Sequence, residues 1–90
     1  MNHVSLQQLR ILRFMLSVYD EPVCGVDLIK GLKMQSGTVY PLLQRMESRG
    51  LVSSKMERGT SQGVGRPLKR LYTLKAPGRN YITRVLRELA

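Results

Sequence analysis

The stretch from Gln35 to Gly50 most constrains what this chain can fold into, because it has the pattern of one amphipathic helix. Gln35 and Ser36 are candidate cap oxygens at its start. Arg49 and Gly50 form a stop, since a cation complements the helix dipole and glycine can turn left-handed. Pro41 is tolerated in about the first turn, where backbone donors lack partners. The predicted apolar face is Val39, Leu42, Leu43 and Met46, and the predicted polar face is Arg45, Glu47, Ser48 and Arg49.

The size and charge of the chain narrow the classes of protein it can represent. With 90 residues it can bury one modest core, so we expect a single domain over residues 1–90. The 15 lysines and arginines against 6 acidic residues give a formal net charge of +9. Such a field attracts polyanions, nucleic acid first and an anionic membrane surface second. A merely basic protein is the alternative, but the clustering of the cations favours nucleic acid.

The cysteine content and the absence of long apolar runs bear on the compartment. Cys24 is the single cysteine and cannot form an internal disulfide, so it is interpreted as a packing residue. The sequence shows no signal peptide and no apolar run of membrane-spanning length. We therefore expect a cytoplasmic protein that does not bind a membrane.

Residues 5–19 predict a first apolar helix, with Ser5 as its N-cap. Its apolar girdle is wider than that of a simple surface helix. Either this helix is central to its own domain, or another subunit buries its second side, and the small size of the domain favours the second interpretation. The girdle consists of Leu6, Leu9, Ile11, Leu12, Phe14, Met15, Leu16, Val18 and Tyr19.

A turn at residues 20–22 separates this helix from a short second one, predicted from about Cys24 to Lys33. Residues 33–34 then lead directly into the helix that begins near Gln35. Two helices joined by a turn of a few residues form a helix-turn-helix. The residues of the second helix expected to face inward are Val26, Ile29 and either Leu32 or Leu28.

The periodicity changes to that of strands after Gly50. Residues 51–56 and 68–75 are predicted strands, and the alternation in the second strand turns Tyr72 and Leu74 to the core. Residues 57–67 are rich in Gly, Ser and Thr and lack a core pattern, so we expect a long loop. The strands and their loop would form a flexible basic wing.

The last predicted helix runs from about residue 78 or 79 to Ala90, after the break at Ala76-Pro77-Gly78. The element order is then helix, helix, helix, strand, wing, strand, helix. We therefore predict a mainly α fold with a small β-hairpin: a winged helix-turn-helix with a three-helix core, a two-stranded wing and a C-terminal helix. The apolar stripe of that last helix is Tyr81, Ile82, Val85, Leu86 and Leu89.

The polar end of the third helix and the wing hold the candidate contacts to duplex DNA. In direct readout, the N-terminal part of that helix enters the major groove, where Gln can pair with adenine and Arg with guanine. For Tyr40 two interpretations remain open: it either only packs against the domain or contacts the DNA. The arginine beside glycines in the wing can approach a phosphate ridge or enter a minor groove. The helix candidates are Gln35, Ser36, Gly37, Thr38, Tyr40, Gln44 and Arg45, and the wing candidates are Arg58, Arg66, Lys69 and Arg70.

Nothing in the sequence predicts an enzyme. It contains one His, one Cys and 6 acids, and no metalloprotease, hydrolase-elbow, paired-cysteine or phosphate-loop motif. We therefore expect no catalytic residue, no metal site and no cofactor, and no pattern supports a small-molecule effector.

The motifs of the third helix and wing resemble those of the PadR family of bacterial transcriptional regulators. The resemblance rests on residues 37–43, on residues 45–52, on Gly65-Arg66-Pro67 followed by Lys69 and Tyr72-Thr73-Leu74, and on Gly78. Residues 24–28 look like the start of that family's second helix, with Val26 where an aromatic residue is usual. The likeness covers roughly Leu9 to the C-terminus.

The resemblance implies a homodimeric, DNA-binding repressor, encoded by a bacterium or a phage, whose third helix and wing contact operator DNA. Family members usually continue into a longer C-terminal helix, whereas this sequence ends at Ala90, with about three turns. It also lacks tryptophan, which weakens transfer of an aromatic drug pocket. Dimerisation would then rest on the last helix and one side of the first, through Leu9, Phe14, Tyr81, Ile82, Val85, Leu86 and Leu89.

Two other functions remain open from the sequence. In the first, a winged helix without specific DNA binding docks a protein partner on the wide apolar side of the first helix. In the second, the same basic surface binds RNA, although few exposed aromatic residues are expected for stacking on bases.

Overall fold

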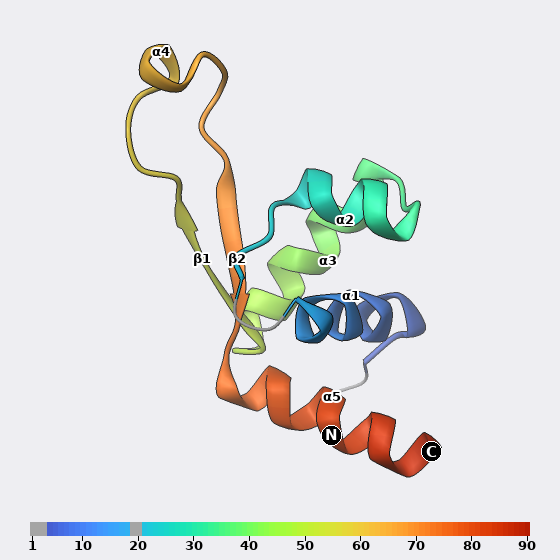
Figure 1. Ribbon diagram of the computed structural model, residues 1–90. Helices are drawn as coiled ribbons and strands as arrows, with labels where there is room; N and C mark the ends of the chain where they lie inside the picture. Colours follow the sequence, from blue (N-terminus) through green and yellow to red (C-terminus); the bar gives the residue numbers. More distant parts are fainter. Residues whose placement is uncertain (1–3, 19–20) are drawn as a thin grey trace.

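The computed structural model describes residues 4–18 and 21–90, and within them the elements follow the predicted order with one addition in the wing (Figure 1). The mainly α fold with a small hairpin is thereby confirmed. A three-helix core carries the two-stranded wing on one side, and the last helix lies at the opposite end from the wing tip. The elements are α1 (Leu6–Ser17), α2 (Gly25–Leu32), α3 (Ser36–Ser48), β1 (Val52–Met56), α4 (Ser61–Val64), β2 (Arg70–Leu74) and α5 (Ala76–Leu89).

Helix α1 begins with a capping box, which confirms Ser5 as its N-cap. The Ser5 hydroxyl accepts a hydrogen bond from the Gln8 amide at 3.2 Å, and the Gln8 side chain accepts one from the Ser5 amide at 2.9 Å. Gln8 is buried through this exchange, with 3% of its surface exposed. The prediction that Leu6 belongs to the buried stripe is wrong, since 73% of its surface is exposed. Leu6 is the first residue of α1, so no preceding turn covers it.

The girdle of α1 is largely covered by its own chain. Ile11, Leu12 and Met15 are buried in the core, and Phe14 lies against Gly31 of α2, where an added Cβ would stand 2.6 Å from the ring. Tyr19, the last predicted member of the girdle, lies outside the described residues. Within the described residues α1 is therefore central to its own domain, and only part of its apolar side remains for another subunit.

Helix α2 has the predicted position, but its buried face is different. Leu28 is fully buried, whereas Val26 is 40% exposed, so the prediction that Val26 faces inward is wrong. The helix ends at Lys33, which adopts a left-handed conformation with φ of 54°, and Met34 is buried beneath the turn. The amide of Met34 donates to the carbonyl of Ile29 at 3.2 Å, a bond that closes the helix end. This fixes the short connection into α3.

The buried face of α3 matches the prediction, since Val39, Leu42, Leu43 and Met46 are its buried residues. Gln35 is the N-cap residue, but its side chain makes no capping hydrogen bond, so the expected role as cap oxygen is not observed. Pro41 lies in the second turn rather than the first, with its ring on the exposed side. The stop is confirmed, because Arg49 is the C-cap and Gly50 has φ of +74°.

Strands β1 and β2 pair antiparallel in a register that places Ser54 opposite Tyr72. The backbone of Tyr72 also bonds that of Val23, just before α2, through two hydrogen bonds of 2.9 Å and 2.7 Å. Tyr72 is buried, as predicted, and burial raises the pKa of its hydroxyl above the ordinary value, with a smaller contribution from the nearby charge of Glu47. The bridge ties the hairpin to the start of the helix-turn-helix.

Two predicted segments differ from the structure. Residues 57–67 are not entirely loop, because the one-turn helix α4 forms at the tip of the wing, with the Thr60 hydroxyl accepting from the Gly63 amide at 3.0 Å. Helix α5 begins at Ala76, earlier than the predicted residue 78 or 79, because Pro77 occupies its first turn, where a missing amide costs no hydrogen bond. The Ala-Pro-Gly sequence therefore starts the helix instead of separating it from the strand.

The core lies where α1, α2, α3 and the start of α5 meet the hairpin. Its buried side chains, within the part of the chain that the structure describes, are apolar except for Gln8, and α3 contributes the face that its spacing predicts. Among the described residues, no helix is long and apolar enough to cross a membrane. The buried residues of the cluster are Ile11, Leu12, Met15, Val23, Leu28, Met34, Val39, Leu42, Leu43, Met46, Val52, Tyr72 and Ile82.

Candidate nucleic-acid interface

The N-terminal end of α3 presents its polar residues to solvent. Gln35, Ser36 and Gly37 are exposed and Thr38 is half-buried, because the apolar residues that follow hold the opposite side of the helix in the core. In Figure 1, α3 runs from behind α2 towards the base of the hairpin. The polar residues at this end of α3 are therefore accessible from solvent.

Tyr40 both packs and remains accessible. It is 46% exposed, and its ring lies against Gly25 at the start of α2, where an added Cβ would stand 2.7 Å from the ring Cζ and 2.8 Å from the hydroxyl oxygen. Only glycine leaves room for the ring in this position. The two predicted roles of Tyr40 are thus compatible, since contact with α2 orients a hydroxyl that is still near the surface.

The later turns of α3 add a polar strip that continues along the same helix. Gln44, Arg45, Ser48 and Arg49 are exposed and line a common hollow of about 320 Å³. The Ser48 hydroxyl donates to the carbonyl of Gln44 at 3.0 Å, which keeps it on the helix. The strip combines amide and guanidinium groups, the donors that read base edges or phosphates.

The wing carries the four predicted cations, but they differ in their surroundings. Arg58, Arg66 and Arg70 are exposed, and Lys69 is half-buried. Arg66 donates from both terminal nitrogens to the carboxylate of Glu57, at 2.7 Å and 2.9 Å. The positive charge of Arg66 is therefore offset within the wing, a pairing that the sequence analysis missed.

The ion pair has a clear effect on the acid. The hydrogen bonds from Arg66 and from the backbone amide of Lys69 lower the pKa of Glu57 from 4.5 to about 2. The same pair raises the pKa of Arg66 above its usual value. Both groups are therefore charged throughout the neutral range.

A second polar link joins α3 to the hairpin. The Ser54 hydroxyl donates to the Glu47 carboxylate at 2.7 Å, and Arg70 donates to the Ser54 oxygen at 3.1 Å. Glu47 belongs to α3, Ser54 to β1 and Arg70 to β2, so the chain of bonds spans three elements. It fixes the orientation of the hairpin relative to α3. The only sequence signal for this link or for the Glu57 pair is an acid surrounded by basic residues, which does not reveal its partner.

The residues predicted for dimerisation are not equally available on the surface. Leu89 is 77% exposed, whereas Ile82 is 1% exposed and packs in the core of its own chain. The guanidinium carbon of Arg84 stands 5.7 Å from the centre of the Tyr81 ring, so this ring is partly covered by its own helix. Leu9, Phe14 and Leu86 are half-buried and pack against the core cluster, and Val85 is half-buried.

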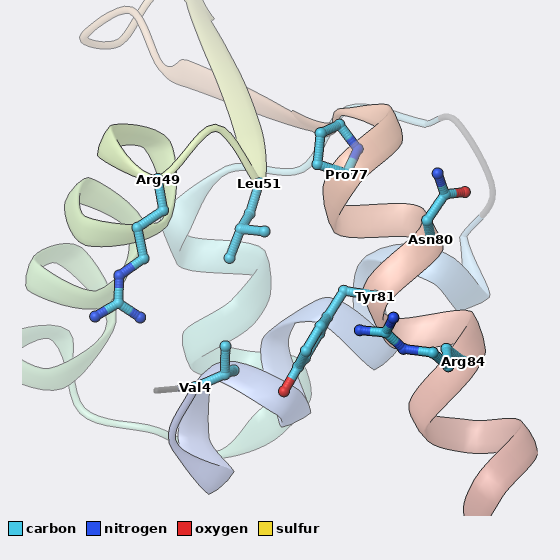
Figure 2. A pocket seen from close by; sticks show the side chains of 7 residues that line it. All are labelled: Val4, Arg49, Leu51, Pro77, Asn80, Tyr81 and Arg84. Carbon is cyan, nitrogen blue, oxygen red and sulfur yellow. The ribbon is translucent and has the colours of Figure 1, made fainter. Parts of the chain in front are cut away.

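An apolar pocket lies between α5 and the end of α3, and it shares Arg49 with the polar strip of α3 (Figure 2). Its volume is about 360 Å³, and none of the predicted DNA-contacting residues lines it. It shares Tyr81 with the predicted dimerisation surface. The pocket is lined by Val4, Arg49, Leu51, Pro77, Asn80, Tyr81 and Arg84.

Two other features of the structure concern its metal-ligating side chains and its single cysteine. No cluster of three or more His, Cys, Asp or Glu side chains in residues 4–18 and 21–90 could hold a metal ion. Cys24 is buried at the start of α2, where it fills space next to the core. Apart from Glu47, the charged groups exposed on α3 and the wing are cations, which suit a polyanionic ligand.

Comparisons with known proteins agree with this description. Residues 17–84 match the transcriptional regulator PadR-like family. A PadR family transcriptional regulator from Eggerthella lenta is 27% identical with a TM-score of 0.71, over 93% of this chain and 75% of that one. A PadR family regulator from Clostridium difficile is 21% identical with a TM-score of 0.78, over 93% of this chain and 86% of that one.

A more distant structure shares the fold alone. A MepR variant from S. aureus, bound to an oligodeoxyribonucleotide, is 17% identical with a TM-score of 0.76, over 96% of this chain and 60% of that one. The comparison with curated proteins finds no match. The family match covers most of the chain, including the helix-turn-helix, the wing and most of α5. The chain belongs to the PadR-like family of transcriptional regulators.

Proposed function

We propose that this regulator binds duplex DNA sequence-specifically as a homodimer and acts as a repressor. The observation that carries the proposal is that the exposed polar end of α3 and a cationic wing, linked to α3 through Ser54 and Glu47, belong to one chain with a net charge of +9. Residues 1–90 form the single winged-helix domain in this proposal, and α5 is the dimerisation element. The MepR variant of the same fold, which was bound to an oligodeoxyribonucleotide, supports DNA as the ligand.

In this proposal, α3 enters the major groove by its N-terminal end. Gln35 and Thr38 precede the buried turn and reach base edges, while Ser36 and Gly37 lie at the helix start, where backbone amides favour a phosphate. Tyr40, leaning on α2, contacts the backbone or a base from a fixed position. Gln44 and Arg45 extend the contact along the groove.

The wing contacts the sugar-phosphate backbone or the minor groove beside α3. Arg58, Lys69 and Arg70 are the proposed contacts, since cations near a duplex gain by neutralising phosphates. Arg66 belongs to the same wing, but its pairing with Glu57 offsets its charge. Strand pairing and the Ser54 link set the position of the wing relative to α3.

Two copies of the chain would read two half-sites, as dimeric helix-turn-helix proteins do. The proposed pairing surface consists of exposed or half-buried apolar groups of α1 and α5, namely Leu9, Phe14, Tyr81, Val85, Leu86 and Leu89. We leave out Ile82, because its own core already buries it. Repression is the expected outcome, because a dimer seated on operator DNA blocks access to that DNA.

A titration of labelled duplex, selected from a random library, tests DNA binding at low salt. We expect the protein to bind, and we expect Gln35→Ala to change the preferred sequence, because a base-reading amide is lost. A matched change at the exposed Gln7 of α1, Gln7→Ala, lies outside the proposed interface and should leave the preferred sequence unchanged. If the parent protein binds no duplex at low salt, the proposal is wrong.

The alternative function is a protein-interaction winged helix that does not bind specific DNA. The observation in its favour is the pair of exposed leucines, Leu6 and Leu89, at 73% and 77%. Size-exclusion chromatography with light scattering separates the two functions. A dimer with DNA affinity supports the regulator, and a monomer without DNA affinity supports the interaction module.

A further inference from the structure

Glu57 closes the base of the wing through its backbone and its side chain. Its amide donates to the carbonyl of Lys69 at 2.8 Å, and its carboxylate accepts from the Lys69 amide at 3.2 Å. The same carboxylate accepts from both terminal nitrogens of Arg66, at 2.7 Å and 2.9 Å. We call these contacts the Glu57 clasp. The clasp therefore joins Glu57, which follows β1, to Arg66 and Lys69, which lie shortly before β2.

The clasp uses the hydrogen-bonding capacity of Arg66. Besides its two bonds to Glu57, Arg66 donates to the carbonyl of Pro67 at 3.1 Å. A bidentate arginine–carboxylate pair has fixed geometry as well as charge, so it orients the chain on both sides. The pKa of Glu57, lowered to about 2, agrees with a carboxylate that stays ionised in this pair.

The segment beyond the clasp has few other restraints. Residues 58–67, including α4, are exposed throughout, so no core contact fixes their direction. Arg58 lies in this segment and makes no hydrogen bond or ion pair with the described residues. In Figure 1 the segment projects beyond the strands, away from α5. Its orientation therefore depends on the contacts at its base.

We propose that Glu57 is a positioning residue for DNA binding, which holds residues 58–67 so that Arg58 meets the DNA backbone. In this arrangement Arg66 is the partner of Glu57 and not a direct contact to phosphate. The inference rests on the proposed DNA-binding function. A carboxylate on its own is repelled by the phosphates of DNA, but in this proposal Glu57 favours DNA binding because it positions the wing.

The sign of one substitution separates positioning from electrostatics. Glu57→Gln removes one negative charge and changes the formal net charge from +9 to +10. If only charge mattered, this variant would bind DNA more tightly than the parent. If the clasp positions the wing, the variant binds more weakly despite its added charge. Residues 58–67 must then be ordered when the DNA binds, and the entropy lost in this step opposes binding.

The experiment measures the Kd for one selected duplex at fixed salt for four proteins: the parent, Glu57→Gln, Arg66→Gln, and the double variant. The double variant has the net charge of the parent but lacks the ionic clasp. We expect all three variants to bind roughly three- to tenfold more weakly than the parent, which corresponds to the net contribution of about one ordinary hydrogen bond. Because both single changes break the same pair, their effects should not add in the double variant.

Glu21→Gln is the matched control, since it removes the same charge from an exposed residue outside the wing. It should bind as tightly as the parent or more tightly. Glu57→Gln binding as tightly as Glu21→Gln would overturn the positioning role, as would a double variant that binds like the parent. If the parent protein binds no duplex, the proposed function is wrong. If the parent binds DNA but Glu57→Gln binds as tightly as the control, only the role of Glu57 is wrong.

Amide hydrogen exchange in the DNA-free proteins gives a readout that does not depend on DNA. The Lys69 amide, which donates to Glu57, should exchange faster in Glu57→Ala, which has no side-chain acceptor, than in the parent. The amide of the buried core residue Leu43 should exchange at the same rate in both proteins, which shows that the variant is folded. An unchanged rate at Lys69 would contradict the clasp.

Discussion

The carboxylate of Glu57 accepts three hydrogen bonds, two from Arg66 and one from the Lys69 amide, and each favours its ionised form. These bonds lower its pKa from 4.5 to about 2. A group whose pKa is lower in the folded protein stabilises the fold above its unfolded pKa. That contribution is lost as the pH falls from about 4.5 through about 2.

We predict that Glu57 stays ionised at pH 4. At this pH, exposed carboxylates without a partner are about half protonated, because their pKa values lie near 4. The carboxyl ¹³C chemical shift followed by NMR should give a midpoint near pH 2. In Arg66→Gln the midpoint should rise towards 4.5, because the largest cause of the lowering is removed. A midpoint near 4.5 in the parent protein would show that the ion pair does not form in solution.

At the scale of elements, the contact between α5 and the strand side of the core is unusually close. Gly78 lies in the first turns of α5, and an added Cβ would overlap the carbonyl oxygen of Leu51 and stand 3.0 Å from its carbonyl carbon. Those atoms are backbone, and the Leu51 carbonyl also accepts from the Lys75 amide at 3.0 Å. A side chain at residue 78 could therefore be accommodated only if α5 moved.

We predict that Gly78→Ala destabilises the protein by about 1–3 kcal/mol, the usual cost of overpacking. For a domain of this size, 1 kcal/mol corresponds to a shift in Tm of roughly 4–8 °C. Thermal unfolding followed by circular dichroism measures this shift. Gly37→Ala is the control, because Gly37 is also helical but has no atom within 4 Å of an added Cβ.

The control should have the opposite sign. Alanine in a helix is favoured over glycine by roughly 0.5–1 kcal/mol, so Gly37→Ala should raise the Tm. If Gly78→Ala also raised the Tm, α5 would not approach Leu51 as closely as the structure shows.

At the scale of the whole molecule, the charge of +9 governs how the protein meets a polyanion. Each phosphate neutralised by a cation releases counterions, so binding should weaken steeply as salt increases. The slope of log Kd against log salt concentration reports how many cations contact phosphates of the duplex. A charge elsewhere on the surface acts only through the overall electrostatic field of the protein.

We predict that Arg58→Gln lowers the slope of log Kd against log salt concentration by about one, because one phosphate contact is lost. Arg13→Gln is the matched control, since it removes the same charge from an exposed position on α1 outside the proposed interface. Fluorescence titrations at several salt concentrations give both slopes. Equal slopes for the two variants would exclude Arg58 from the contact with DNA.

Local features of the fold could be predicted because neighbours in sequence decide them. The buried face of α3, the N-cap at Ser5 and the stop at Gly50 each depend on residues within a few positions. The order of elements follows from the same patterns, and the motifs of α3 and the wing indicated the family that the comparison shows.

The tertiary structure decided what depends on segments far apart in the chain. Leu6 is exposed because none of the described elements covers the start of α1, and Gly25 receives the ring of Tyr40. Arg66 is paired because the hairpin register brings Glu57 beside it. By itself, the sequence determined the order and approximate extent of α1, α2, α3, the two strands and α5, since short-range spacing sets those, but it did not predict α4. Only the folded chain determined which charges and apolar side chains remain on the surface, because packing between distant elements settles their exposure and their partners.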